Sequence, residues 1–480
     1  MNYEYDAVVV GAGPNGLAAG ITLVRAGCSV LLIEANSQIG GACRSSELTL
    51  PGFIHDVCSA IHPLAVGSPF FRSLSLDQYG LKWIHPDLPL AHPLDDHCSA
   101  LHRSMADQIL ELAQDGGVYR RLMEPLASNW ELITAEILQP LLHLPQSPFL
   151  LARFGMHALR PATSLAHSLF RSESTRALFA GLAAHSFLSL DQPASSSVGL
   201  VLAMLAHAVG WPMPEGGAGQ ITRALGNYFQ ARGGKIVTNQ RVKNIDELPP
   251  ARALFLDLTP RQVLEIAHHR LPARYCRALR AFRYGPAVFK IDYALSAPVP
   301  WKFSSCAMAG TVHLGGKFSE IHTNEQKVFA GELPVRPFVL LAQPSLFDAT
   351  RAPHGKHVAW TYCHVPHACD VDVTQKIEDQ IERFAPGFRD CVLARCVRGP
   401  KLLEKENANL VGGDINGGLA DLRQLIARPV LRFHPYRTSI KRTYICSAST
   451  PPGGGVHGMA GYNAALFSLT NDFKVPFPKN

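Results

Sequence analysis

The segment between residues 5 and 34 constrains the fold of this chain most, because it joins a buried strand, a glycine turn and a helix in a fixed order. Residues 5–10 read YDAVVV, an apolar run typical of a buried parallel strand. The turn that follows has the G-x-G-x-x-G spacing, as Gly11-Ala12-Gly13-Pro14-Asn15-Gly16. In such a turn the first glycine permits the bend, the second lets a pyrophosphate approach the backbone, and the third lets the helix pack closely on the strand.

The elements after this turn complete a dinucleotide-binding unit. We expect a helix over residues 17–25, whose free N–H groups and positive dipole end suit phosphate groups. A second strand over residues 28–33 ends in Glu34, which lies 18 positions after Gly16. An acidic side chain at about that distance accepts hydrogen bonds from an adenosine ribose. The order of these elements predicts an α/β protein with a Rossmann-type domain.

A second glycine turn favours FAD over NAD as the dinucleotide. Glu34 is followed by Gly40-Gly41-Ala42-Cys43-Arg44-Ser45, an E-x5-G-G-x-x-R-S pattern near the N-terminus. This pattern resembles the FAD-binding signature of the amine oxidase and phytoene desaturase flavoproteins, whose cofactor domain is of the glutathione-reductase-like type. The resemblance implies that Gly40, Gly41, Arg44 and Ser45 bind FAD together with Glu34 and Ala35. A guanidinium such as that of Arg44 suits the diphosphate because it is a rigid, permanently charged fork.

Three other stretches extend the resemblance. Residues 51–64 match a segment that lies under the flavin ring in that family, which makes Ser59, Ala60 and His62 candidate contacts of the cofactor. Residues 211–225, WPMPEGGAGQITRAL, resemble the family's P-x-G-G-x-G segment. Residues 234–245 alternate like a strand, and the resemblance implies that the backbone of Val242 binds the adenine.

The C-terminal part of the chain supplies the last piece of the predicted FAD site. A strand over residues 443–447 leads into a glycine-rich loop and then an apolar helix. A helix N-terminus at that place stabilises the negative charge that builds on a flavin when it takes a hydride. The stretch resembles the C-terminal flavin motif of the same family, although relatives carry an acidic residue where this chain has CSAST at 446–450. The predicted contacts are Ser449, Gly458, Met459 and Ala460.

Two histidines are the candidates for catalysis. His457, in the terminal glycine-rich loop, is the best candidate for a side chain that faces both flavin and substrate, as a proton donor or a positioning group. His62 is the second candidate. For each, the alternative is that the imidazole only packs or bonds within its own loop.

The predicted architecture interleaves an FAD-binding domain with an α+β substrate domain. The FAD-binding parts are expected at 1–75, 212–270 and 431–480, and the substrate domain at 76–211, which is mostly helical, and at 271–430. Within the helical part no acidic residue occurs between Glu136 and Glu173, while arginines and apolar residues are frequent. This composition suits the edge of a membrane contact over 137–172, the wall of a tunnel for an apolar substrate, or plain core.

The predicted activity follows from the cofactor and from the resemblance. No second strand-linked G-x-G-x-x-G is present, so a second nucleotide domain is not expected. We expect hydride transfer between an apolar, polyene- or isoprenoid-like carbon skeleton and FAD, with a quinone or oxygen as electron acceptor. One alternative is an amine oxidase, which needs an aromatic pair at the flavin, from Trp211, Trp301, Trp360, Tyr362 and Tyr462. Others are a redox-neutral isomerase and a non-catalytic FAD-binding module.

Composition and spacing argue against several other classes of protein. The net charge of +7 comes without a lysine–arginine cluster, so nucleic acid is not an expected partner. The histidines between residues 85 and 102 lack the tight pairs and carboxylates of a metal centre, and we expect no metal. No stretch of 18 uninterrupted apolar residues occurs, so no spanning helix is expected.

The cysteines indicate a reducing compartment. The chain has eleven, scattered and without a C-x-x-C pair, and its first strand begins within five residues of Met1, which leaves no room for a signal peptide. We therefore expect a cytoplasmic protein. Cys43 stands where pyridine-nucleotide disulfide reductases carry a redox cysteine, but the position five residues later is Leu48, so dithiol chemistry is not expected.

Overall fold

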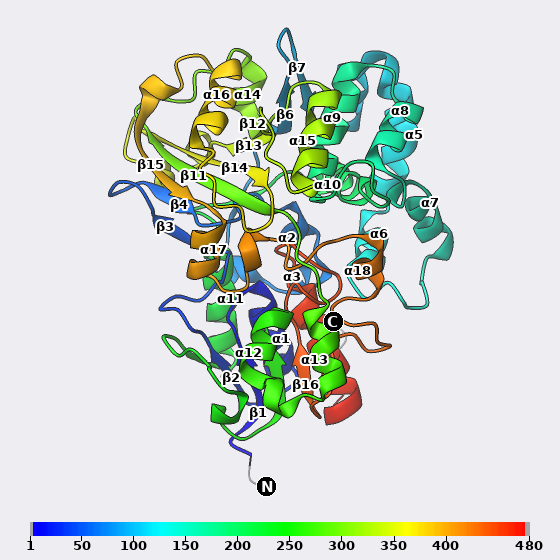
Figure 1. Ribbon diagram of the computed structural model, residues 1–480, viewed down its shortest axis with the longest axis vertical. Helices are drawn as coiled ribbons and strands as arrows, with labels where there is room; N and C mark the ends of the chain where they lie inside the picture. The colour runs from blue at the N-terminus through cyan, green and yellow to red at the C-terminus, as the bar shows by residue number, and fades with distance from the viewer. Residues whose placement is uncertain (1–2, 476–480) are drawn as a thin grey trace.

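The computed structural model describes residues 3–475, which build two sheets, each covered by helices (Figure 1). The first sheet is entirely parallel and lies at the end of the molecule that carries the N-terminus. Its strand order is β16-β10-β1-β2-β9. The strands are β1 (Tyr5–Val10), β2 (Val30–Ile33), β9 (Lys235–Val237), β10 (Ala251–Leu256) and β16 (Thr443–Ile445).

Helices cover both faces of this parallel sheet, as buried parallel strands require. On one face α1 (Pro14–Arg25), α11 (Gly219–Ala231) and α19 (Met459–Ser468) share a core with β1. On the other face α12 (Pro260–Ala267) and α13 (Ala273–Arg280) pack against the ends of β1, β10 and β16. Helices α1 and α19 meet backbone to backbone, because a Cβ on Gly461 would lie 1.7 Å from the carbonyl oxygen of Asn15.

The second sheet is mixed, with the order β15-β11-β14-β13-β12-β6-β7. All of its pairs are antiparallel except β12 with β6. Its strands are β6 (Leu88–Pro93), β7 (Cys98–Leu101), β11 (Ala287–Leu295), β12 (Ala309–Leu314), β13 (Val339–Ala342), β14 (His357–Val365) and β15 (Val392–Arg398). Along β14 the side chains alternate, so that Trp360 and Tyr362 face the helical half of the molecule while Ala359 and Cys363 join the core on the other face.

The helical half of the substrate domain packs beside this sheet (Figure 1). It comprises α4 (Met105–Glu111), α5 (Gly116–Ala127), α6 (Trp130–Ile137), α7 (Pro148–Ala158), α8 (Ala162–Leu169), α9 (Glu173–Ala184) and α10 (Ser196–Ala208), with α15 (Phe318–Phe329) against α9. The second sheet also carries α14 (Ser304–Met308) and α16 (Thr374–Phe384). Between residues 3 and 475 no helix is both long enough and apolar enough to span a membrane.

Short elements connect the two halves. They are α2 (Pro63–Gly67), α3 (Pro69–Arg72), α17 (Pro400–Glu406), α18 (Leu422–Ile426), the ribbon of β3 (Ser45–Glu47) with β4 (Ile54–Asp56), and the ribbon of β5 (Trp83–Ile84) with β8 (Met213–Pro214). The chain passes between the sheets several times, since the parallel sheet takes strands from both ends and from the middle. The predicted α/β class with a Rossmann-like sheet is confirmed, while the predicted domain boundaries stay predictions.

One predicted strand is wrong beyond its first residues. The expectation for residues 234–245 holds only for β9, which ends at Val237. After it the chain bonds to the loop that follows β2, because the amides of Asn239 and Gln240 donate to the carbonyl oxygens of Asn36 and Glu34, each at 2.9 Å. An edge segment can stay extended without a partner strand, so alternation alone could not locate the end of β9.

Candidate cofactor and active site

A cavity of about 260 Å³ lies at the carboxyl ends of the parallel strands. Ligands of open α/β sheets bind outside that edge, where loops from different strands converge. The cavity is lined by the first glycine turn, the end of β2, residues 240–243, Asp257 and residues 406–409. Glu34, Ala35 and Val242 are therefore brought together at this cavity, as predicted for the adenosine end of the cofactor.

The glycines of the first turn are required by close backbone contacts. Gly11 has a φ of +98°, which a side chain disfavours, and a Cβ on Gly16 would lie 2.0 Å from the carbonyl oxygen of Gly11. A Cβ on Gly13 would lie 2.7 Å from a carboxylate oxygen of Asp257, on the cavity wall. Helix α1 begins at Pro14, so Pro14, Asn15 and Gly16 form its first turn, earlier than the predicted start at Leu17. The free N–H groups of this turn point toward the phosphate position that the motif predicts.

Glu34 is buried at the end of β2, with 5% of its surface exposed. One carboxylate oxygen accepts a bond of 2.9 Å from the Ala12 N–H, and the other accepts from the backbone N–H and side-chain amide of Asn36. Each carboxylate oxygen can accept more than one hydrogen bond. The arrangement holds the carboxylate at the cavity wall with capacity left for the hydroxyl groups of a ribose.

The second glycine turn abuts the first. A Cβ on Gly41 would lie 3.2 Å from the Cα of Gly13, so the two turns share a space that only glycines leave open. Gly40 and Gly41 both have positive φ values. Arg44 donates from Nε to the carbonyl oxygen of Gly41 at 2.8 Å and so braces this turn. A contact of Arg44 with a diphosphate stays a prediction.

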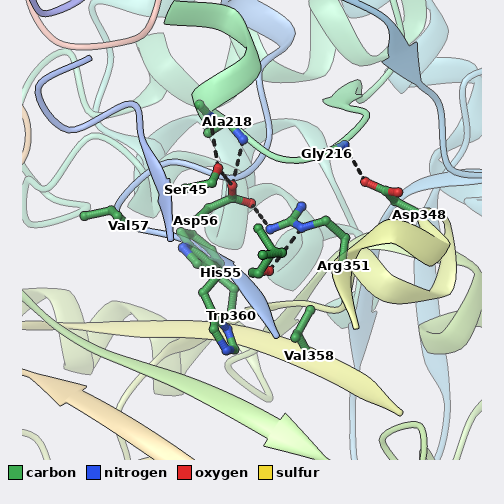
Figure 2. Close-up of polar contacts among 12 residues, drawn as sticks. Ser45, His55, Asp56, Val57, Gly216, Ala218, Asp348, Arg351, Val358 and Trp360 are labelled. Atoms are coloured by element: carbon green, nitrogen blue, oxygen red, sulfur yellow. Dashed lines mark hydrogen bonds and ion pairs between the residues drawn. The ribbon is translucent and has the colours of Figure 1, made fainter. Parts of the chain in front are cut away.

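Ser45 belongs to a network that ties the second glycine turn to the substrate domain (Figure 2). Its hydroxyl donates to Asp56 at 2.8 Å and accepts from the Gly219 N–H at the start of α11. Asp56 also accepts from the Ala218 N–H and forms a fully buried ion pair of 2.8 Å with Arg351. The guanidinium of Arg351 and these hydrogen bonds hold the pKa of Asp56 below its usual value in spite of its burial. Ser45 therefore positions loops.

The segment predicted to lie under the flavin ring is buried. Ala60 is 3% exposed and belongs to the same apolar core as Trp360 and Tyr362. The ring of His62 bonds through Nε2 to the hydroxyl of Ser59 at 3.0 Å, while its Nδ1 is buried with no partner among residues 3–475. Burial lowers the pKa of His62 to about 4, so the ring is neutral at neutral pH.

The terminal loop encloses His457 completely. Its Nδ1 accepts from the Met459 N–H at 3.0 Å, and its carbonyl oxygen accepts from the hydroxyl of Ser68 at 2.6 Å. Gly458, with a φ of +66°, precedes helix α19, which begins at Met459 and Ala460. Burial lowers the pKa of His457 to about 4. Its contacts shape the loop, and its role as a proton donor stays a prediction.

Ser449 bonds within the terminal loop region. It is buried, and its hydroxyl donates to the carbonyl oxygen of Gly417 at 2.7 Å. A direct contact with FAD stays a prediction, as it does for the other predicted residues of this loop. Among residues 3–475, no three side chains of His, Cys, Asp or Glu gather in a way that could hold a metal ion.

Sequence reasoning missed Asp257 and its neighbours. Asp257 follows β10 and accepts a bond of 2.9 Å from the Gly16 N–H, within the turn that receives a diphosphate in this kind of fold. Burial, with the charge of Glu34 adding to it, raises the pKa of Asp257 to about 7. Asn409 donates to the backbone carbonyl of Asp257 at 2.9 Å. The position of Asp257 after a buried strand was the available signal, because polar groups at that edge face the ligand.

A buried charge cluster was also missed. Asp292 on β11 lies between Lys290 on the same strand and Arg398 on β15, and each is at most 1% exposed. Arg398 also donates to the carbonyl oxygen of Val57 at 2.8 Å, and the Lys290 ammonium lies 5.6 Å from the ring centroid of Trp360. Burial lowers the pKa of Lys290 to about 8. The residues come from distant parts of the chain, so no local pattern announced them.

Cys43 is a packed residue. Its sulfur is buried and donates to the carbonyl oxygen of Ala218 at 3.3 Å, and all eleven cysteines are free thiols. Burial raises the pKa of Cys43, which opposes formation of the reactive thiolate.

Comparison with known proteins places this geometry. Residues 9–74 match the family model described as NAD(P)-binding Rossmann-like domain. The mouse pyridine nucleotide-disulfide oxidoreductase domain-containing protein 2 is 28% identical, over 96% of this chain and 93% of that protein. A lycopene-forming phytoene desaturase of Pseudescherichia vulneris is 24% identical, over 96% of this chain and 98% of the desaturase.

Solved structures show the same fold. An oxidoreductase of Methanosarcina mazei superposes with a TM-score of 0.66 at 17% identity, over 97% of this chain and 100% of that one. Putrescine oxidase bound to putrescine superposes with a TM-score of 0.62 at 15% identity, over 98% and 99%. The chain belongs to the FAD-dependent oxidoreductase superfamily. The cavity of this flavoprotein fits the adenosine half of FAD, because Gly13 and Gly41 leave a cradle that a Cβ would fill and Glu34 lines its wall.

Proposed function

We propose that this flavoprotein dehydrogenates an apolar, polyene- or isoprenoid-like substrate and passes the electrons to a quinone or to oxygen. FAD supplies the chemistry by accepting a hydride. The observation that carries the proposal is the apolar core above the cofactor domain, where Ala60 shares a cluster with Trp360, Tyr362 and the inner faces of α9 and α10. These residues would bind an apolar chain, orient it toward the 58–62 segment and exclude water. The match to a phytoene desaturase over nearly its whole length supports the same class of substrate.

Anaerobic flavin reduction tests this proposal. We expect the visible absorbance of the oxidised flavin to bleach when phytoene is added to the purified holoprotein without oxygen. Restoring oxygen or adding a quinone should return the colour. A holoprotein that phytoene and other isoprenoids leave fully oxidised, under conditions where dithionite reduces it, would contradict the proposal.

Amine oxidation is the second candidate function, and one observation favours it. An amine oxidase needs an aromatic pair at the flavin, and Trp360 and Tyr362 stand edge to face with ring centroids 5.1 Å apart. Trp360 also donates from its indole nitrogen to the carbonyl oxygen of Cys58 at 2.8 Å, beside the segment expected under the flavin. Putrescine and cyclohexylamine in the same anaerobic experiment distinguish the two functions. Bleaching by neither class of compound would favour the isomerase or the FAD-binding module.

We further propose that α7 and its flanking segments contact an anionic membrane surface, from which an apolar substrate would enter. Helix α7 lies at the outer edge of the helical half (Figure 1). One side of the segment 137–172 is core, since Phe154, Ala158 and Phe170 are buried. The α7 patch is the set of exposed apolar side chains on the other side: Leu141, Leu142, Leu144, Phe149, Met156 and Leu159. The exposed Arg153 and Arg171 lie in the same acid-free segment, a combination that suits anionic lipid headgroups.

A further inference from the structure

A buried carboxylate–imidazole pair lies beyond the aromatic pair of the second sheet. His364 stands near the end of β14, on the face that carries Trp360 and Tyr362, with its ring centroid 5.8 Å from that of Tyr362. Its Nδ1 lies 2.9 Å from both carboxylate oxygens of Glu325 on α15. His364 and Glu325 are each 2% exposed. The pair is part of the interior that the proposed substrate would enter.

The contact with Glu325 decides what the other nitrogen of His364 can do. A carboxylate only accepts hydrogen bonds, so the Nδ1 of His364 carries a proton and donates it. The Nε2 is buried and has no partner among residues 3–475. A buried polar atom left unpaired costs about 1–3 kcal/mol, so such an atom calls for a ligand. Glu325 fixes the ring so that Nε2 points away from α15 and presents one hydrogen-bonding position.

The surroundings of His364 limit the kind of ligand. The ring of Phe187 lies 4.0 Å from that of His364 and the ring of Phe338 lies at 6.1 Å, so the walls are aromatic. Burial lowers the pKa of the neighbouring His185 to about 3, and that ring adds no charge at neutral pH. An anionic ligand group would therefore meet the carboxylate of Glu325 without a compensating cation among the residues named here, whereas a plain hydrocarbon would leave Nε2 unpaired. A hydroxyl group fits both protonation states of the ring, because it donates to neutral imidazole and accepts from imidazolium.

We propose that His364, oriented by Glu325, binds the hydroxyl group at one end of an isoprenoid alcohol. The inference rests on the proposed function, since it assigns the polar end of the apolar substrate. The alcohol chain would lie along the row Trp360–Tyr362, with its hydroxyl at Nε2. The depth of this anchor would then set which carbon atom reaches the cofactor.

Binding of a matched pair of ligands to the FAD-loaded protein tests the inference. The probes are farnesol and the hydrocarbon that lacks only its hydroxyl oxygen, titrated against the flavin absorbance spectrum. We expect the wild-type protein to bind farnesol at least about tenfold more tightly than the hydrocarbon, the effect of one buried hydrogen bond. His364→Phe should abolish this preference and leave hydrocarbon binding unchanged, whereas His364→Gln, which keeps a hydrogen-bonding group, should retain part of it. Glu325→Gln should reduce the preference, because it no longer fixes the ring.

The control is His357→Gln on the same strand, because His357 faces Ser345 and lies outside the aromatic row; this variant should keep the full preference. The His364 variants are compared only after their FAD content and Tm match the wild type, and His364→Gln serves if His364→Phe does not fold. Equal affinities of the wild type for both ligands would overturn the inference and leave the proposed function standing. Failure of both ligands to bind would overturn the two together.

Discussion

At the residue scale, the decisive groups are carboxylates that accept backbone N–H bonds at the cofactor cavity. Glu34 accepts from Ala12, and Asp257 accepts from Gly16. The two differ in how well the sequence revealed them, because Glu34 stands at a motif distance and Asp257 does not. The raised pKa of Asp257, about 7 against an ordinary 3.8, makes it the titrating group of the cavity.

Asp257 makes FAD binding depend on pH. A diphosphate near this carboxyl repels its charged form and raises its pKa further, so the bound state holds the proton to higher pH than the free state. Affinity for FAD should therefore be highest below about pH 7 and fall, by roughly tenfold, as the pH rises to 9. Asp257→Asn keeps an oxygen for the Gly16 N–H and removes the titration, so its affinity should be flat over this range. The measurement is FAD binding to the apoprotein by fluorescence quenching between pH 6 and 9.

A matched control for Asp257→Asn is Asp115→Asn. Asp115 is also buried and accepts N–H bonds, from Arg171 and Ser172, but it lies in the helical half away from the cavity. This variant should keep the wild-type pH dependence. The same pH slope in Asp257→Asn as in the wild type would show that another group controls the titration.

At the element scale, the charge cluster of Lys290, Asp292 and Arg398 joins two neighbouring strands of the second sheet. Strands β11 and β15 pair in antiparallel register, with Asp292 opposite Cys396 and Lys290 opposite Arg398. A buried charge set of this kind is not by itself a source of stability, but removal of one member leaves the others unpaired. The cluster also holds the Val57 carbonyl and so connects the second sheet to the segment before Ala60.

Loss of the central carboxylate should weaken this junction strongly. Asp292→Ala leaves Lys290 and Arg398 without their shared partner in the interior, and we expect the free energy of unfolding to fall by about 3–5 kcal/mol. Urea denaturation of the wild type and the variant measures this difference. Asp95→Ala is the control, because its ion pair with Arg383 is on the surface, with Asp95 60% exposed, and should be worth at most about 1 kcal/mol. Similar losses for both variants would contradict the assignment.

At the scale of the whole molecule, the apolar surface is unevenly distributed. Leu144 and Phe149 in the α7 patch are 94% and 92% exposed, whereas the apolar residues of the two sheets are mostly buried. Exposed apolar side chains in a cluster mark contact sites for other molecules or for membranes. The patch lies on the helical half, the same part of the molecule whose interior would hold the substrate.

The α7 patch predicts binding to anionic vesicles. The wild-type protein should float with liposomes that contain phosphatidylglycerol, and the double variant Leu144→Asp, Phe149→Asp should lose most of this binding. Neither substitution should change the Tm by more than a degree or two, because both side chains are almost fully exposed. Leu110→Asp, at a 78% exposed leucine on α4 outside the patch, should float like the wild type. Flotation that all three proteins share, or that none shows, would remove the proposed membrane contact.

The sequence by itself determined the parts of this protein whose physics is local. Gly11, Gly13 and Gly16 are needed within one turn, and the strand, the helix and Glu34 follow at fixed distances, so the motif predicted the cofactor domain and the cavity wall. The same locality explains the limit of the method at β9. The alternation of residues 234–245 describes an extended chain, but only the partner of each amide decides where the strand ends.

Only the tertiary structure decided the groups whose partners are distant in the chain. Asp257 meets Gly16, Asp56 meets Arg351, and Glu325 meets His364 across hundreds or tens of residues. Their burial, and with it the raised pKa of Asp257, exists only once the two sheets and the helical half have packed. A sequence pattern records which side chains can be buried, whereas packing decides which polar atoms share the same interior and which of them is left without a partner.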